Sequence, residues 1–209
     1  MILSTSLYSF DFVLCMDYTE KLSPYAEGVK ALPEKIAQRL SELMESLYKS
    51  IKQVRVAVLS QGVSTPFYNL AEEKENLIEA LSRVTPCETP NPVASLYHAM
   101  KADWIQVPKG EKRKHAVIML SDGEPSFENL PTYCPQNLPD FCKIWQNSGE
   151  GMESTMSFKH KKLFLMIPED KASSWSLFYN LDKASPEVLT PTPIPVDELA
   201  DRFASQLIF

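Results

Sequence analysis

Several motifs that would indicate a particular chemistry are missing from this sequence. Its four cysteines form no C-x-x-C pair, which argues against a zinc ribbon or a dithiol redox site. Only six glycines occur, and none completes G-x-G-x-x-G or G-x-x-x-x-G-K, the loops that cradle phosphates. A G-x-S-x-G nucleophile elbow is also absent. The usual signatures of nucleotide-binding and serine-dependent enzymes are therefore lacking.

Basic charge and long apolar stretches are scarce as well. The formal net charge is −6 and the pI is about 5.2, so a basic face for nucleic acid is not expected. The densest basic cluster, at 109–114, directly precedes an apolar stretch and is interpreted as a solvated loop. No stretch reaches the roughly 18–20 apolar residues of a membrane span, and the first residues lack the basic start of a secretion signal. We expect a cytoplasmic protein with reduced thiols that contacts neither membrane nor nucleic acid.

Short apolar stretches alternate with amphipathic patterns along the whole chain. Apolar stretches rich in strand formers predict strands at 10–16, 54–59, 116–120 and 163–167, with weaker ones at 67–70 and 187–190. Apolar residues at helical spacing predict helices at 29–51, 77–84, 93–104, 138–146, 175–180 and 196–207. Ser23-Pro24 is expected to open the first helix, and Pro33 to kink or restart it.

This alternation predicts right-handed βαβ crossovers. The predicted fold class is α/β and doubly wound, with a mostly parallel central sheet flanked by helices on both faces. No internal repeat or low-complexity linker divides the chain, so a single domain spanning 1–209 is expected.

Two carboxylates follow predicted strands and are candidates for a binding site. Asp17 directly follows the strand at 10–16, and Asp122 follows the strand at 116–120. In an open parallel sheet, ligands bind at the carboxyl ends of the strands, beside the point where strand order reverses. Thr19 adds a hydroxyl two residues after Asp17. Oxygen ligands from separate loops are typical of a Mg²⁺ site.

The order of these motifs resembles the von Willebrand factor A (vWA) family over nearly the whole chain. An apolar strand ends in a variant of Asp-x-Ser/Thr-x-Ser, a long helix follows, a Thr-Pro loop opens a later helix, and Ser-Asp-Gly follows another apolar strand. The resemblance implies a Rossmann-like three-layer fold and a metal-ion-dependent adhesion site (MIDAS). By that resemblance, the ligands of a Mg²⁺ or Mn²⁺ ion would be Asp17, Thr19, Thr89 and Asp122.

Lys21 stands where the family places the second hydroxyl, so the motif is degenerate. Charges of +2 and +1 about 4 Å apart repel by roughly 8 kcal/mol at an effective dielectric near 20. Lys21 could instead swing into water, or its ammonium could replace the cation and neutralise Asp17 and Asp122. Glu20 could add a carboxylate and favour the metal. Both residues are also candidate contacts for a partner.

The resemblance implies a protein-interaction module, an adaptor or scaffold, and not an enzyme. Members of the family capture an acidic residue of a protein partner at the metal site, and Lys21 could pair with such a carboxylate directly. The motifs at 100–104 and 137–141 resemble bacterial, stand-alone, intracellular vWA domains. The oligomeric state stays open.

Two alternatives remain. Asp17 after the first strand also suits a Mg²⁺-dependent phosphoryl-transfer hydrolase of the haloacid dehalogenase type, although Thr19 occupies the position of its general acid. A purely structural subunit with an inactive cleft is the other. The loops at 124–137 and 148–159 are long enough to carry partner specificity.

Overall fold

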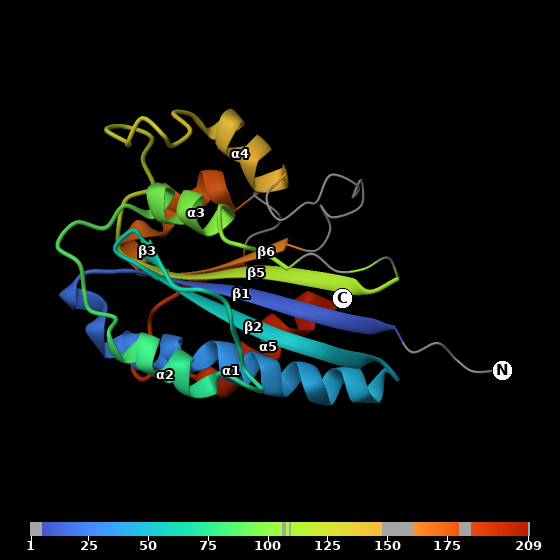
Figure 1. Ribbon diagram of the computed structural model, residues 1–209. Coiled ribbons are helices and arrows are strands. Elements are labelled where there is room, and N and C mark those ends of the chain that lie inside the picture. Colours follow the sequence, from blue (N-terminus) through green and yellow to red (C-terminus); the bar gives the residue numbers. More distant parts are fainter. Residues whose placement is uncertain (1–5, 106–107, 109, 148–160, 180–184, 209) are drawn as a thin grey trace.

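The computed structural model describes residues 6–105, 108, 110–147, 161–179 and 185–208. Within these residues the strands form one seven-stranded sheet in the order β3-β2-β1-β5-β6-β7, with β4 also paired to β2 (Figure 1). Neighbours are parallel except that β3 and β4 run antiparallel to β2. The strands are β1 (Leu7–Asp17), β2 (Ser50–Ser60), β3 (Val63–Ser64), β4 (Tyr68–Asn69), β5 (Lys112–Ser121), β6 (Lys161–Ile167) and β7 (Ser185–Val188).

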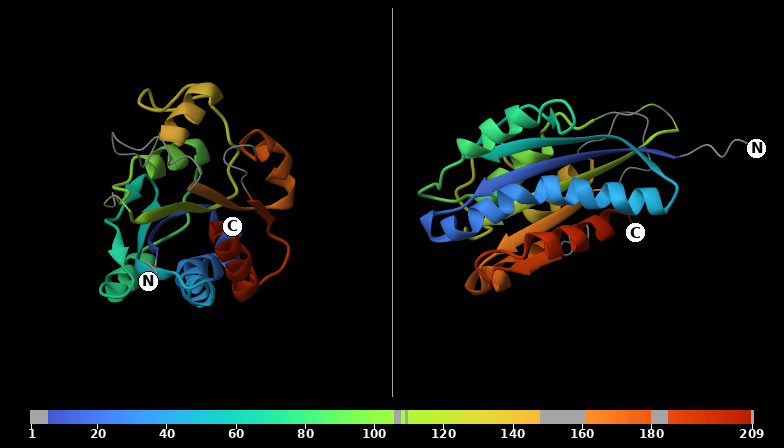
Figure 2. Two further views of the ribbon diagram at one scale, coloured as in Figure 1. Left: turned by 90° about the vertical axis from the view of Figure 1, so that its right-hand side faces the viewer. Right: turned by 90° about the horizontal axis from the view of Figure 1, so that it is seen from below.

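Helices cover both faces of this sheet, as the predicted fold class required (Figure 2). One face packs against α1 (Ser23–Ser46), α2 (Lys74–Ser82) and α5 (Val196–Ile208). The other packs against α3 (Pro92–Met100), α4 (Leu138–Asn147) and the 3₁₀ helix η3 (Glu169–Phe178). The architecture is therefore a three-layer α/β sandwich. No helix in the described part of the chain is long and apolar enough to cross a bilayer.

The central strand β1 explains why the sheet is buried on both faces. Phe10, Phe12 and Leu14 point toward α1 and α5, whereas Val13 and Cys15 point toward α3. All five side chains are fully buried. Since successive residues of a strand face opposite sides, a strand covered twice must be apolar at nearly every position.

The strand order reverses between β1 and β5. The chain leaves β1 through α1 to reach β2 on one side of β1, and β5 then lies on the other side. In the register of this pair, Asp17 is opposite Ser121, so both strands end together. The carboxyl ends of β1 and β5 therefore meet at one edge, with the loops after them side by side. In folds of this kind ligands bind at such an edge.

The structure corrects several predicted boundaries. The helix predicted at 93–104 ends at Met100, and the one predicted at 175–180 is the 3₁₀ helix Glu169–Phe178. The first helix ends at Ser46, not at 51, because Tyr48 adopts a left-handed φ of 53° and Ile51 already belongs to β2. Pro33 neither stops nor restarts this helix. The basic cluster at 109–114 is not all loop, since β5 begins at Lys112.

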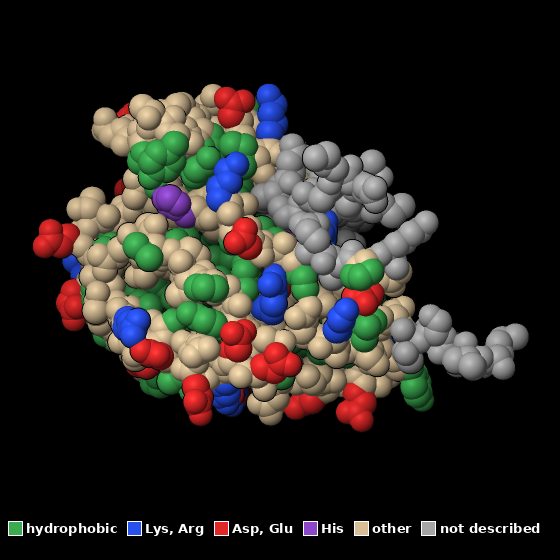
Figure 3. All heavy atoms as spheres, in the orientation of Figure 1, with side chains coloured by type: hydrophobic (Ala, Val, Ile, Leu, Met, Phe, Trp, Pro, Cys, Tyr) green, Lys and Arg blue, Asp and Glu red, His purple; other side chains and the backbone are tan. Residues whose placement is uncertain are grey.

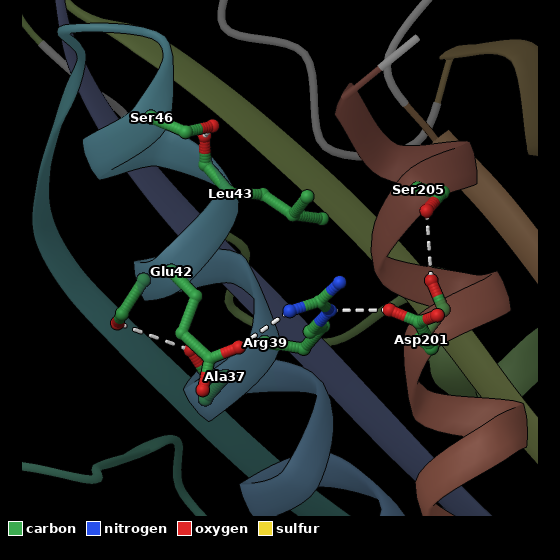
Figure 4. A network of polar contacts seen from close by, with 8 residues as sticks. Ala37, Arg39, Glu42, Leu43, Ser46, Asp201 and Ser205 are labelled. Carbon is green, nitrogen blue, oxygen red and sulfur yellow. Dashed lines mark hydrogen bonds and ion pairs between the residues drawn. The ribbon is translucent and has the colours of Figure 1, made fainter.

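Polar contacts join the first and last helices on the outside of the molecule. The guanidinium of Arg39 on α1 contacts the carboxylates of Glu42, at 2.5 Å, and of Asp201 on α5 (Figure 4). Lys35 and Asp197 form a second link between these helices at 3.1 Å. These side chains are solvent-exposed, so the apolar seam beneath them contributes most of the stability.

Candidate functional site

Asp17 lies at the carboxyl end of β1 and is only 6% exposed. Its Oδ1 accepts a hydrogen bond from the backbone N–H of Asn91 at 3.1 Å. Its Oδ2 accepts one from the hydroxyl of Ser121 at 3.1 Å. The backbone N–H of Gly123 donates to the same Ser121 oxygen, also at 3.1 Å. The carboxylate is thus held by the start of α3 and by the last residue of β5.

Burial raises the pKa of Asp17 above its usual value. The hydrogen bonds from Asn91, Ser121 and Ser95 lower this pKa in part, and the negative charge of Asp122 raises it again. The site therefore holds negative charge in a position where water stabilises it poorly. A cation or a hydrogen-bond donor arriving here would be favoured.

Thr19 and Asp122 join the loops after β1 and β5. The backbone N–H of Thr19 donates to Asp122 Oδ1 at 2.9 Å, and the Thr19 hydroxyl donates to Asp122 Oδ2. Hydrogen bonds to a charged acceptor are the stronger kind. Two residues that are 103 positions apart in the sequence are therefore fixed against each other at the switch point.

A cleft of about 650 Å³ opens beside these loops. The Tyr133 hydroxyl lies 3.4 Å from His98 Nε2, and both side chains line the cleft. Thr89 is exposed and shares this cleft with Asp17. The lining residues are Asp17, Gln61, Gly62, Thr85, Pro86, Cys87, Glu88, Thr89, Asn91, Ala94, Ser95, His98 and Tyr133.

The predicted site residues thus fall into three groups. Asp17 and Thr89 line the cleft, and Thr19 and Asp122 are bonded to each other next to it. Glu20 and Lys21 form the third group. They lie in the short 3₁₀ helix η1 (Glu20–Leu22), and both are exposed.

Within the described residues, Lys21 forms no ion pair with a carboxylate. Lys171, near the start of η3, is a cation on which the charge of Asp122 has a small effect. Its ammonium lies 2.8 Å from Glu124, and its pKa is raised chiefly by that hydrogen bond and also by the charge of Asp122. The sequence carries no signal for this contact, because Lys171 and Glu124 lie 47 residues apart.

Asn91 is a second residue that sequence reasoning did not single out. Its side chain caps α3 by accepting from the Ala94 N–H at 3.2 Å, and Pro92 follows it in the first turn. An Asn before Pro is a recognisable helix start, so the cap was visible in the sequence. The hydrogen bond that the backbone N–H of Asn91 donates to Asp17, which is 74 residues away, was not visible in the sequence.

The donor chemistry of these loops is compatible with a hard cation. Asp17, Thr19 and Asp122 offer oxygen atoms only, as Mg²⁺ and Mn²⁺ prefer. The hydrogen bonds described above use part of the acceptor capacity of each carboxylate and leave further lone pairs. No group of three or more His, Cys, Asp or Glu side chains suited to a metal occurs among the described residues. Any ion here would therefore rely on hydroxyl and water ligands as well.

Comparison with known proteins identifies the type of fold but not the chemistry of the candidate site. No protein-family model matches the sequence, and no curated protein matches it either. Among solved structures, a von Willebrand factor type A protein from Catenulispora acidiphila is similar, with a TM-score of 0.57 and 10% identity. The match covers 97% of this chain and 43% of that one, so this chain spans less than half of its length. The fold is therefore of the vWA type, a mostly parallel Rossmann-like sandwich.

Proposed function

We propose that this chain is a protein-interaction module, an adaptor or scaffold, that docks a partner in the cleft beside Asp17. The observation that carries the proposal is the position of the cleft. It opens at the point where strand order reverses, and a buried, hydrogen-bonded carboxylate forms part of its lining. A vWA-type fold supports a protein-interaction or metal-site domain in general.

The partner is proposed to contribute an acidic residue. Two routes bring a carboxylate to this negatively charged edge. A Mg²⁺ or Mn²⁺ ion at Asp17, Thr19 and Asp122 would leave a coordination position for it. Alternatively, the exposed ammonium of Lys21 pairs with it directly, in an interaction that added salt weakens. The proposal has two further parts. The MIDAS is degenerate, and the protein acts in the cytoplasm of a bacterium.

The rim of the cleft supplies apolar contact area for such a partner. The rings of Tyr97, His98 and Tyr133 lie together, with the Tyr97 and Tyr133 centroids 6.1 Å apart and those of His98 and Tyr133 5.8 Å apart. Tyr133 is 57% exposed. Tyrosine is enriched among the side chains that dominate binding energy at protein interfaces. Tyr133 is therefore the proposed anchor.

No observation favours the hydrolase of the haloacid dehalogenase type over this module. A phosphatase assay with generic phosphoesters tests the hydrolase alternative. Turnover by wild type that disappears in Asp17→Asn would establish hydrolase activity and overturn the proposal of an interaction module.

The test begins with a displayed peptide library rich in Asp and Glu, selected against the wild-type protein. Selected peptides are measured by calorimetry against wild type, Tyr133→Ala and a matched control, Tyr48→Ala. Tyr48 is 88% exposed and follows α1 on the opposite helical layer. We expect Tyr133→Ala to weaken binding by about tenfold or more and Tyr48→Ala to leave it unchanged. Equal affinities for both variants would place the binding elsewhere.

A further inference from the structure

Four lysines gather at the amino edge of the sheet, the edge opposite the cleft. Figure 1 shows the amino ends of β1 and β5 together, on the side away from the carboxyl ends where α3 begins. Lys112 and Lys114 begin β5, Lys162 lies at the start of β6, and Lys49 precedes β2. This set, Lys49, Lys112, Lys114 and Lys162, is called the lysine cluster below.

The ring of Tyr8 on β1 joins two members of the cluster. Lys49 Nζ lies 5.6 Å and Lys112 Nζ lies 5.4 Å from its centroid. Tyr8 is 6% exposed and stacks on Phe10 at 6.3 Å, so the ring is fixed. Two ammonium groups on one ring are attracted by it but repel each other.

Strand register brings the other two lysines to the same face. Lys112 is opposite Tyr8, and Lys114 is opposite Phe10. Lys162 pairs with Ala116, two residues beyond Lys114. Because residues two apart in a strand share a face, Lys112, Lys114 and Lys162 lie on the face that packs against α1 and α5.

The positive charge of the cluster has no counterpart among the described residues. None of its four lysines forms an ion pair there, whereas the neighbouring Lys52 is paired with Glu111 at 3.0 Å. Burial lowers the pKa of Lys114, and so do the charges of Lys162, Lys112 and Lys49. In Figure 3, by contrast, acidic and basic side chains are mixed over the face shown. The chain as a whole carries −6.

We propose that the lysine cluster is a binding site for a compact multivalent anion of the phosphate class. Four neighbouring ammonium groups, on three partly buried lysines and the exposed Lys112, repel each other in the free protein, and a polyphosphate group would relieve that repulsion. Lysine binds phosphate as a point charge, without the planar geometry that arginine imposes. The site is independent of the cleft, which lies at the other edge of the sheet.

The test uses inorganic tripolyphosphate as the probe, with calorimetry and thermal unfolding of the full chain at low salt. Binding is expected at about 1 mM probe or below, with a raised melting temperature. Lys114→Met and Lys162→Met should each weaken binding by about tenfold, and binding should fall steeply as salt is added. Lys52→Met is the matched control, since Lys52 lies at the same edge but is paired.

The variants must stay folded for this comparison to hold. Lys114→Met keeps an unbranched apolar stem and removes one repelling charge, so it should melt no lower than wild type. No binding of tripolyphosphate by wild type would overturn the proposal. Equal weakening in Lys52→Met and Lys114→Met would also overturn it, because the anion would then respond to overall charge alone.

Discussion

The carboxylate of Asp11 and the guanidinium of Arg55 meet at two points between neighbouring strands. Nε lies 2.8 Å from Oδ1 and Nη2 lies 2.6 Å from Oδ2. Asp11 is fully buried, and its Oδ2 also accepts from the backbone N–H of Ile105 at 2.6 Å. The guanidinium lies 4.7 Å from the Phe67 ring centroid. This pair ties β1, β2 and the segment after α3 together, far from the cleft.

Removing Arg55 should destabilise the protein strongly. Arg55→Ala leaves a buried carboxylate with no cation opposite it, and loss of one partner of a buried pair costs about 3–5 kcal/mol. Urea unfolding at neutral pH measures the change. Lys74→Ala is the control, since it breaks an exposed pair with Glu34 and should cost about 0.5 kcal/mol or less. A similar small loss in both variants would show that the Asp11 pair adds nothing.

The same pair predicts a pH dependence. Burial raises the pKa of Asp11 above its usual 3.8, more than the Arg55 hydrogen bonds and charge lower it. The folded state therefore binds this proton more tightly than the unfolded state. The contribution of Asp11 to the free energy of unfolding should grow as the pH falls through the folded pKa, and level off below the usual value.

Other carboxylates titrate too, so the measured quantity is the difference between wild type and Asp11→Asn. This difference in unfolding free energy should shift in favour of wild type between about pH 7 and pH 4. Arg55→Ala, which lacks the compensating charge, should gain more on acidification than wild type does. A difference that stays constant with pH would contradict the raised pKa.

The fold was largely predictable because its signals are local. Apolar stretches such as 116–120 and 163–167 can be buried on both faces only inside a covered parallel sheet, and they are. The first helix was overextended because Leu47 and Ile51 continue its 3.6-residue spacing by chance. The turn at Tyr48 carries no glycine to mark it. The two-residue strand β3 is too short to leave a periodic pattern.

Metal dependence should show whether Lys21 keeps a divalent ion out of the site formed by Asp17, Thr19 and Asp122. If Lys21 excludes the ion, wild type shows no change in melting temperature with Mg²⁺ or Mn²⁺, whereas Lys21→Ser does. At about ten times Kd the ion adds roughly 1.4 kcal/mol, or about 3–6 °C for a chain of this size. Thr19→Val, added to Lys21→Ser, should remove the shift. No shift in either wild type or Lys21→Ser would mean that this edge is not a metal site.

Gly123 should not accept a side chain. A Cβ there would lie 2.7 Å from Pro92 Cδ and 2.9 Å from Pro90 Cβ, and both prolines are rigid. Gly123→Ala is therefore expected to cost about 1–3 kcal/mol in thermal or urea unfolding. Pro92→Ala in the same molecule removes one of the two obstacles and should recover part of the loss. Full tolerance of Gly123→Ala alone would show that the loop moves freely.

The site was only partly predictable, for a physical reason. Asp17 and Asp122 could be placed because each directly follows an apolar strand, and parallel strands end at one edge. The hydrogen bonds that fix these two carboxylates could not be predicted from the sequence. Asn91 reaches Asp17 through its backbone N–H, a group that every residue type except proline carries. Lys171 meets Glu124 only after β6 has paired with β5.

The pairing of α1 with α5 has a consequence for synthesis of the chain on the ribosome. Arg39 and Asp201 are 162 residues apart, and the rings of Phe164 and Phe203 stack at 4.2 Å. The part of this sheet face that α5 covers therefore stays exposed until α5 has left the exit tunnel. Loops this long close slowly, and uncovered apolar strands aggregate. Until α5 docks, the nascent chain thus exposes apolar strand surface of the kind that chaperones bind.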